Sequence, residues 1–135
     1  MSDPVVTEFP SGCRVVSGGL DADNSAAAAG GSGGLARGSA LAEGGMWLGI
    51  SELPAGHAST LHHHDGQATI VYLIRGEMTF LVDRADGRTD EFTARAGEIA
   101  AIPGGLNHRE ENRGGEPCLC VVVRNADQPR VVNIE

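Results

Sequence analysis

Short apolar runs dominate the chain from Met46 onward, and clusters of Gly, Pro and charged residues separate them. No window keeps the 3.6-residue period of an amphipathic helix, because Gly or Pro interrupts every candidate. Strands joined by tight turns at this spacing predict an antiparallel barrel or sandwich. We therefore expect an all-β core from about residue 46 to residue 132, with strands at 46–53, 59–64, 69–74, 77–83, 90–94, 98–102, 118–124 and 130–134.

The preceding stretch, residues 17–45, has a different character. It consists mostly of Gly, Ala and Ser and has almost no large apolar side chain. Such a segment cannot bury enough surface to offset the entropy that it loses on ordering. The sequence thus predicts an N-terminal arm over residues 1–45, partly flexible, followed by a β-barrel domain over residues 46–135.

Composition fits one folded domain. The chain has 135 residues, of which 41% are hydrophobic and 21% charged, as is usual for a globular protein. The formal net charge of -8 opposes a phosphate backbone, so we expect no nucleic-acid partner. The first residues lack the pattern of a secretory signal and no run is long enough to span a membrane, so we expect a cytoplasmic protein whose three cysteines are reduced.

The five histidines occur in two places, four at positions 57–64 and one at position 108. Successive side chains of a strand alternate between its faces, so His62 and His64 share one face and His63 points to the other. A divalent metal needs a third protein ligand, and His108, after a Pro-Gly-Gly turn, is the remaining distant imidazole. The sequence predicts one metal site formed by His62, His64 and His108.

Two motifs around these histidines resemble those of the cupin superfamily, in particular small single-domain bacterial cupins of unassigned activity. The second cupin motif, G-x5-P-x-G-x2-H-x3-N, is matched at every position by Gly97, Pro103, Gly105, His108 and Asn112.

The first cupin motif, G-x5-H-x-H-x4-E-x6-G, is matched by Gly56, His62, His64 and Gly76, but Thr69 stands at its glutamate. The resemblance implies a double-stranded β-helix, or jelly roll, with the metal inside the barrel. In the family, the glutamate and three histidines surround the ion, and here only the three histidines carry over.

Loss of the glutamate would leave a neutral three-histidine face and a more Lewis-acidic metal. Water, the side-chain carbonyl of Gln67 or the hydroxyl of Thr69 could take the open position. We rank water first, then Gln67, then Thr69.

Candidate catalytic bases are few. Among acidic residues of the core strand motifs we identify only Glu77 and Glu98, both beside turns. Proton transfer would then depend on a metal-activated water, on His63, on Tyr72 or on the substrate itself. Asn112 is expected to be structural, because Asn often bonds to nearby backbone groups.

These features favour an enzyme that uses one divalent transition metal, Fe, Zn, Mn or Ni, on a small organic molecule. Iron would suit dioxygenase chemistry, as in the cupin thiol and diketone dioxygenases that the site resembles, and the other metals would suit isomerisation, cyclisation, elimination or hydrolysis. The alternative is a non-catalytic module that binds a small molecule or a metal. No membrane partner is expected, and the apolar run at 118–124 predicts a homodimer.

Overall fold

The computed structural model describes residues 5–17 and 36–134, and these residues form β-strands and no helix. None of this part of the chain could cross a membrane as a long apolar helix. In chain order the strands are β1 (Val5–Glu8), β2 (Arg14–Ser17), β3 (Ala36–Glu43), β4 (Met46–Leu53), β5 (His62–His63), β6 (Thr69–Arg75), β7 (Glu77–Asp83), β8 (Thr89–Arg95), β9 (Ile99–Ile102), β10 (His108–Glu111), β11 (Cys118–Arg124) and β12 (Val132–Asn133).

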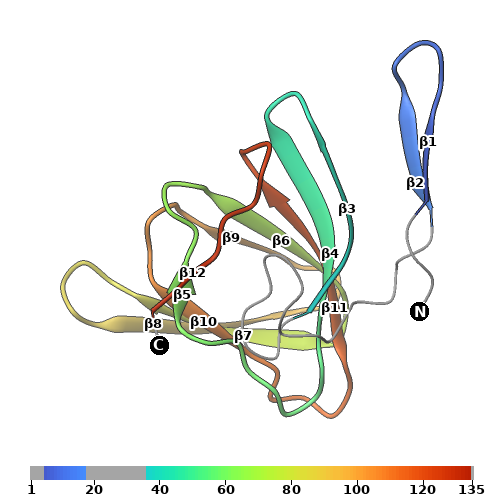
Figure 1. Ribbon diagram of the computed structural model, residues 1–135. Coiled ribbons are helices and arrows are strands. Elements are labelled where there is room, and N and C mark those ends of the chain that lie inside the picture. The colour runs from blue at the N-terminus through green and yellow to red at the C-terminus, as the bar shows by residue number, and fades with distance from the viewer. Residues whose placement is uncertain (1–4, 18–35, 135) are drawn as a thin grey trace.

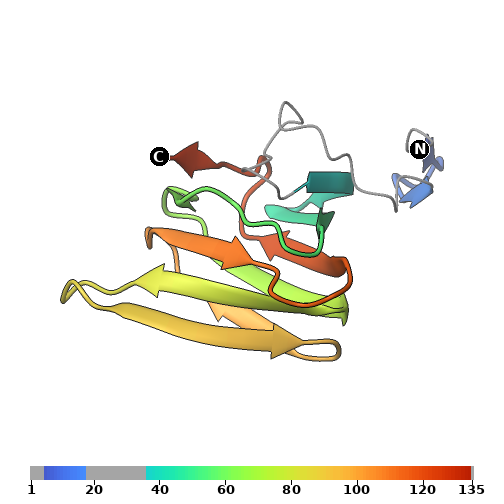
Figure 2. The same ribbon diagram turned by 90° about the horizontal axis from the view of Figure 1, so that it is seen from below.

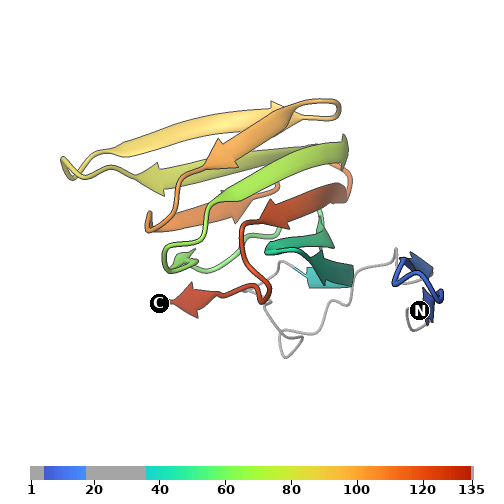
Figure 3. The ribbon, with the colours of Figure 1, turned by 90° about the horizontal axis from the view of Figure 1, so that it is seen from above.

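Two five-stranded antiparallel sheets face each other. One has the order β12-β5-β10-β7-β8 and the other the order β3-β4-β11-β6-β9. Figure 2 looks onto the first sheet and Figure 3 onto the second. Neighbours in each sheet are mostly distant in sequence, as in a jelly roll, so the predicted all-β fold is confirmed.

Alternation along the strands fills the space between the sheets. In β11 every second residue is buried, from Cys118 to Arg124. Phe80, Leu73 and Leu53 are fully buried in the same core. The apolar part of the core therefore excludes water from the interior, into which a few polar side chains also project.

The second sheet begins before the expected domain boundary. Strand β3 pairs with β4 from Ala36 to Glu43, so the N-terminal arm supplies an edge strand of the barrel. Its sequence, ARGSALAE, has few β-formers, and the backbone ladder with β4 sets its conformation instead. The Gly-rich residues 18–35, for which we predict flexibility, lie outside the described residues.

Strands β1 and β2 form a separate hairpin that extends away from the barrel (Figure 1). Arg14 joins it to the end of β3, where its guanidinium donates to the carbonyl of Ala42 over 2.6 Å and pairs with Glu43 over 3.2 Å. The hairpin is thus tied to the barrel by polar contacts.

The outer face of the second sheet is apolar. Cross-strand pairing aligns two rows over β4, β11, β6 and β9. One row is Leu48, Val123, Ile70 and Ala101, and the other is Val121, Tyr72 and Ile99, with Ile50 as its buried end. Ile70 and Ile99 are 49% and 68% exposed. An exposed apolar patch of this kind is typical of an interaction surface.

We propose that a second copy of the chain covers this face. The net charge of -8 makes two copies repel, and these two rows carry no charge, so the repulsion is weakest where they meet. Light scattering should give about twice the chain mass of 13.9 kDa. Ile70→Glu should give a monomer, because a charge buried in an apolar interface is costly.

Thr89→Glu is the matched control, since it adds the same charge on the exposed end of β8 in the other sheet and should leave the dimer intact. A wild-type chain that stays monomeric at all concentrations would contradict the proposal.

Candidate metal centre

Three imidazoles converge in the barrel interior. His62 lies on β5 and His108 begins β10, and the two are directly paired in the ladder. His64 is the first residue after β5 and lies on the same face as His62. All three side chains are buried, and a nitrogen atom from each lies within 4.8 Å of the others.

Backbone carbonyl groups fix the protonation of each ring. Nδ1 of His62 lies 2.7 Å from the carbonyl oxygen of Thr60, and Nδ1 of His108 lies 3.0 Å from that of Leu106. Nδ1 of His64 lies 2.6 Å from the carbonyl oxygen of Arg130. A carbonyl oxygen only accepts hydrogen bonds, so each Nδ1 carries a proton and donates. A neutral ring then has its lone pair on Nε2, which is how histidine is prepared to bind a metal.

The donor atoms are spaced as ligands of one ion. Nε2 of His64 and Nε2 of His108 are 3.2 Å apart. Two ligands that each lie about 2.1 Å from a metal, at angles between 90° and 110°, are roughly 3.0–3.5 Å apart. The His64 and His108 nitrogens have this spacing, and a nitrogen of His62 lies within 4.8 Å of them, so the set can hold one divalent transition metal ion.

A close backbone contact holds the two histidine-bearing loops together. Gly104, in the turn before His108, lies so near Gly66, just after His64, that a Cβ atom on Gly104 would overlap the carbonyl oxygen of Gly66. Only glycine allows this approach, which brings the ligands of the two motifs into one site.

Opposite charges flank the imidazoles. Oε1 of Glu110 lies 3.2 Å from Nε2 of His108, and Oε2 lies 3.6 Å from Nε2 of His62. On the other side, Nη2 of Arg124 lies 3.3 Å from Nε2 of His64. Glu110 and Arg124 are both buried. The centre thus has an acidic side at His62 and His108 and a basic side at His64.

The pKa values of the ligands follow this division. Burial, together with the charge of Arg124, lowers the pKa of His64 to about 3. Burial also lowers the pKa of His62, although the charge of Glu110 opposes it. Burial acts in the same direction on His108, but the hydrogen bond and charge of Glu110 outweigh it and raise the pKa of His108.

Thr69 and Gln67, which we predicted as possible ligands, have other partners. Thr69 is buried on the inner face of β6, and its hydroxyl accepts a hydrogen bond from Nε of Arg124 over 3.2 Å. Gln67 accepts from the backbone N–H of Arg130 over 3.0 Å and donates to the carbonyl of Gln128 over 2.8 Å. Gln67 therefore anchors the C-terminal segment, residues 128–132, in which the carbonyl of Arg130 orients His64.

The structure does not bring His63 and Tyr72, our predicted catalytic residues, to the imidazoles. His63 points to the opposite face from His62, and its Nδ1 accepts the backbone N–H of Asp65 over 3.0 Å. Tyr72 belongs to the outer face of β6 and is 44% exposed. Neither side chain belongs to the buried interior that holds the three histidines.

Sequence reasoning missed Glu110 and Arg124. The expectation that Glu77 and Glu98 are the only acidic residues of the core strand motifs was wrong, because Glu110 lies inside the second motif. The signal was available, since residues two apart on a strand share a face and Glu110 follows His108 by two. The same alternation in β11 turns Arg124 inward with Cys120 and Val122.

Asn112 has the structural role that we expected. Its amide donates to the carbonyl groups of Leu53 and Glu116 over 2.9 Å and 2.8 Å, and its side-chain oxygen accepts the N–H of Gly114. It thereby fixes the turn that follows β10.

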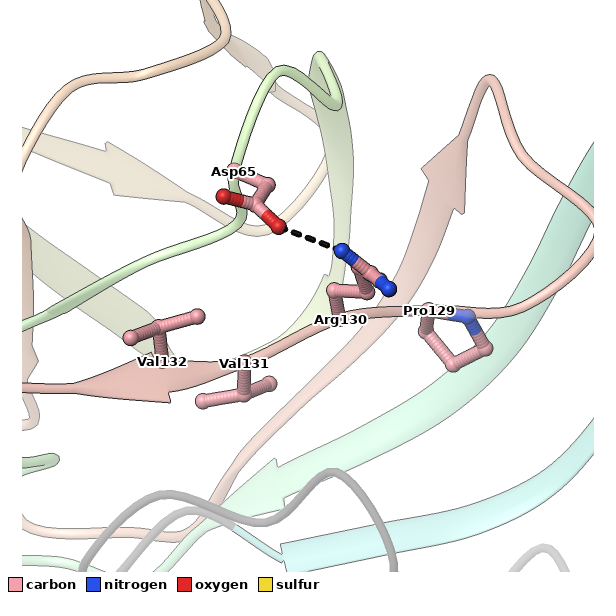
Figure 4. A pocket seen from close by; sticks show the side chains of 5 residues that line it. All are labelled: Asp65, Pro129, Arg130, Val131 and Val132. Carbon is pink, nitrogen blue, oxygen red and sulfur yellow. Dashed lines mark hydrogen bonds and ion pairs between the residues drawn. The ribbon is translucent and has the colours of Figure 1, made fainter.

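A cavity of about 350 Å³ lies beside the C-terminal segment, lined by Asp65, Pro129, Arg130, Val131 and Val132 (Figure 4). Asp65 and Arg130 form an ion pair of 2.6 Å at its edge. This ion pair joins the loop after His64 to the C-terminal segment, whose Arg130 carbonyl accepts a hydrogen bond from Nδ1 of His64. The ion pair therefore supports the position of His64 from outside the barrel.

Residues 49–124 match the family model described as Cupin domain, which covers more than half of the chain. This region contains all three histidines, Glu110 and Arg124. No curated protein matches the chain in sequence.

Solved structures with a similar fold include oxalate decarboxylase of Bacillus subtilis, with 22% identity and a TM-score of 0.66 over 76% of this chain and 28% of that one. A structure described as oxalate oxidase has 21% identity and a TM-score of 0.66 over 87% of this chain and 59% of that one. Peruvianin-I, a cysteine peptidase from Thevetia peruviana latex, has 19% identity and a TM-score of 0.63 over 67% of this chain and 56% of that one.

At these identities the likeness shows the fold alone, and the chain spans between 28% and 59% of the length of these three structures. Their descriptions name different activities, two on oxalate and one of a cysteine peptidase. The chemistry of this chain must therefore be argued from its own site.

Gly104→Ala should weaken metal binding roughly tenfold or more, because its Cβ atom would push apart the loops that carry His64 and His108. Gly115→Ala is the matched control, since a Cβ atom there meets nothing within 4 Å. Titration of both variants with Co²⁺ or Zn²⁺ against a competing chelator measures the difference. Equal affinities would show that the close contact does not position the ligands.

Metal affinity should fall with pH in a defined way. His108, whose pKa is raised, should be the first of the three ligands to take up a proton as the pH falls, because the pKa values of His62 and His64 are lowered. A metal must displace that proton, so affinity should be constant above the pKa of His108 and fall as the pH drops through it. Chelator competition between pH 8 and pH 5 tests this, and an equal affinity at both ends of this range would contradict it.

Proposed function

Because the chain belongs to the cupin family, we propose that it is an enzyme that holds one divalent transition metal ion through His62, His64 and His108 and acts on a small organic molecule. The observation that carries this proposal is the convergence of three buried imidazoles, each of which donates a hydrogen bond from Nδ1 to a backbone carbonyl. Folding alone prepares such a site, so the protein need not rearrange to bind an ion.

The site offers reactive potential as well as affinity. A bound ion of Fe, Zn, Mn or Ni would act as a Lewis acid on a substrate oxygen or, in the case of iron, support dioxygenase chemistry. Iron, manganese and nickel ions take up to six ligands, so the protein side chains leave coordination positions for a substrate. The imidazoles are buried in the same barrel as an apolar core that includes Phe80, Leu73 and Val71, and such a core keeps bulk water out.

Arg124 favours a substrate with an anionic oxygen. Its guanidinium lies beside His64 at the basic side of the centre, and the face of Trp47 lies 5.4 Å from its central carbon. In a buried setting, its charge attracts a carboxylate or an enolate more strongly than it would in water. Two of the structurally similar proteins are described as enzymes of oxalate, a small dicarboxylate, which agrees with this substrate class.

We also propose a cytoplasmic location. Cys13, Cys118 and Cys120 are free thiols, and the last two are buried inside the barrel. Free cysteines are usual in a reducing compartment.

Protein purified without added metal should contain close to one transition metal ion per chain. His108→Ala should lose it, because one of three convergent ligands is removed, whereas His57→Ala should keep it, because His57 is an exposed loop residue. Elemental analysis by mass spectrometry identifies and counts the metal. An equal metal content in wild type and His108→Ala would refute the site.

The enzymatic part is tested with the metal-loaded protein and a panel of small carboxylic acids, thiols and dicarbonyls, by oxygen uptake and by product analysis. Turnover that is lost in His108→Ala would support the proposal. A metal-loaded chain that binds members of the panel without converting them would instead favour a non-catalytic binding module.

A further inference from the structure

We propose that Glu110 is the fourth protein ligand of the metal centre, so that the carboxylate missing from β6 at Thr69 is supplied from β10. The inference rests on the proposed metal site and names a residue that neither the cupin motifs nor the histidine spacing assigns. Three independent features of the structure carry it, namely the donor distances, the occupant of the usual carboxylate position and the support behind Glu110.

The first feature is distance. The Glu110 carboxylate approaches two histidines through the same nitrogen, Nε2, that each would use for a metal, at 3.2 Å for His108 and 3.6 Å for His62. The first separation falls within the range expected between neighbouring ligands of one ion, about 3.0–3.5 Å, and the second lies just above it. A protonated Nε2 donates a hydrogen bond to this carboxylate, and a metal ion bound at Nε2 would take the place of that proton between the same two atoms. The carboxylate therefore lies beside two of the three histidines, where it can join them in holding an ion.

The second feature is the position that the family motif would give to a carboxylate. At that position the Thr69 hydroxyl accepts from Nε of Arg124, and the guanidinium continues to Nε2 of His64. A positive side chain therefore stands where the negative one would be, and it would oppose a cation placed close to it. A carboxylate is needed on the far side of the centre to compensate, and Glu110 lies there.

The third feature is the support of the carboxylate. The hydroxyl of Ser59 donates to Oε2 of Glu110 over 2.7 Å, and the backbone N–H of Glu110 donates back to the Ser59 hydroxyl over 3.0 Å. This reciprocal pair fixes the side chain inside the barrel, where an unsupported carboxylate would be costly. Metal-binding carboxylates are characteristically held by such additional hydrogen bonds.

Glu110→Gln tests the proposal because it keeps the shape of the side chain and removes its charge. We expect the affinity for Mn²⁺ and Co²⁺ to fall at least about a hundredfold, and the Mn²⁺ electron paramagnetic resonance spectrum and Co²⁺ visible spectrum to change. Glu111→Gln is the matched control, since the neighbouring carboxylate pairs with Arg113 on the other face of β10. It should change neither the affinity nor the spectra.

A fall in affinity with unchanged spectra would show that Glu110 acts only through the histidines, and this would overturn its role as a ligand. An unchanged affinity would overturn it as well, while leaving the three-histidine site intact. If the wild type binds no metal, both this inference and the proposed function fail.

A second measurement does not depend on the variant's ability to fold. In a crystal structure of the zinc-loaded wild type, a Glu110 oxygen should lie about 2.0–2.2 Å from the ion. A carboxylate outside bonding distance of the ion would overturn the proposal, whatever the result for Glu110→Gln.

Discussion

The burial of three imidazoles and two charged side chains inside an apolar barrel is the constraint on which the rest of the structure depends. Buried polar groups are costly unless each has a hydrogen-bond partner or an opposite charge. The fold meets this requirement with backbone carbonyls for the Nδ1 atoms, a serine hydroxyl for Glu110 and a threonine hydroxyl for Arg124. The two sheets, the C-terminal segment and the Gly104 contact all serve to bring these partners into place.

The sequence was sufficient for the fold because the signals of the strands are local. Apolar alternation and Gly-Pro turns indicated the strands from residue 46 to residue 124, and the same alternation placed His62 and His64 on one face. Strand β3 was not predictable in this way, since ARGSALAE has little β-propensity and its conformation depends on the backbone of β4. Propensity says little about an edge strand that is held by its neighbour.

The candidate site was predictable only in part, for a similar reason. The three histidines follow from spacing, but the partners of Thr69, Gln67 and Glu110 depend on contacts between strands that are far apart in the chain. Arg124 meets Thr69 because β11 lies beside β6. Gln67 meets the C-terminal segment because that segment leads into β12, which pairs with β5. Comparison with the motif alone suggested an unfilled ligand position at residue 69. The register of β6 and β11 instead places the guanidinium of Arg124 beside Thr69.

The placement of a carboxylate at Glu110, and of a guanidinium rather than a carboxylate beside Thr69, affects the reactivity of a bound metal. A carboxylate at residue 69 would reduce the positive charge that a metal presents to a substrate, and this reduction is what the threonine was expected to avoid. In the arrangement that we propose, Glu110 holds the ion on one side and Arg124 adds a positive charge on the other. The two side chains have no net charge together, but each acts on a different partner. The carboxylate contributes affinity, and the guanidinium preserves the attraction for an anionic substrate. A centre of this kind can bind its metal firmly and still act on a carboxylate or enolate, because the two tasks fall to residues on opposite sheets.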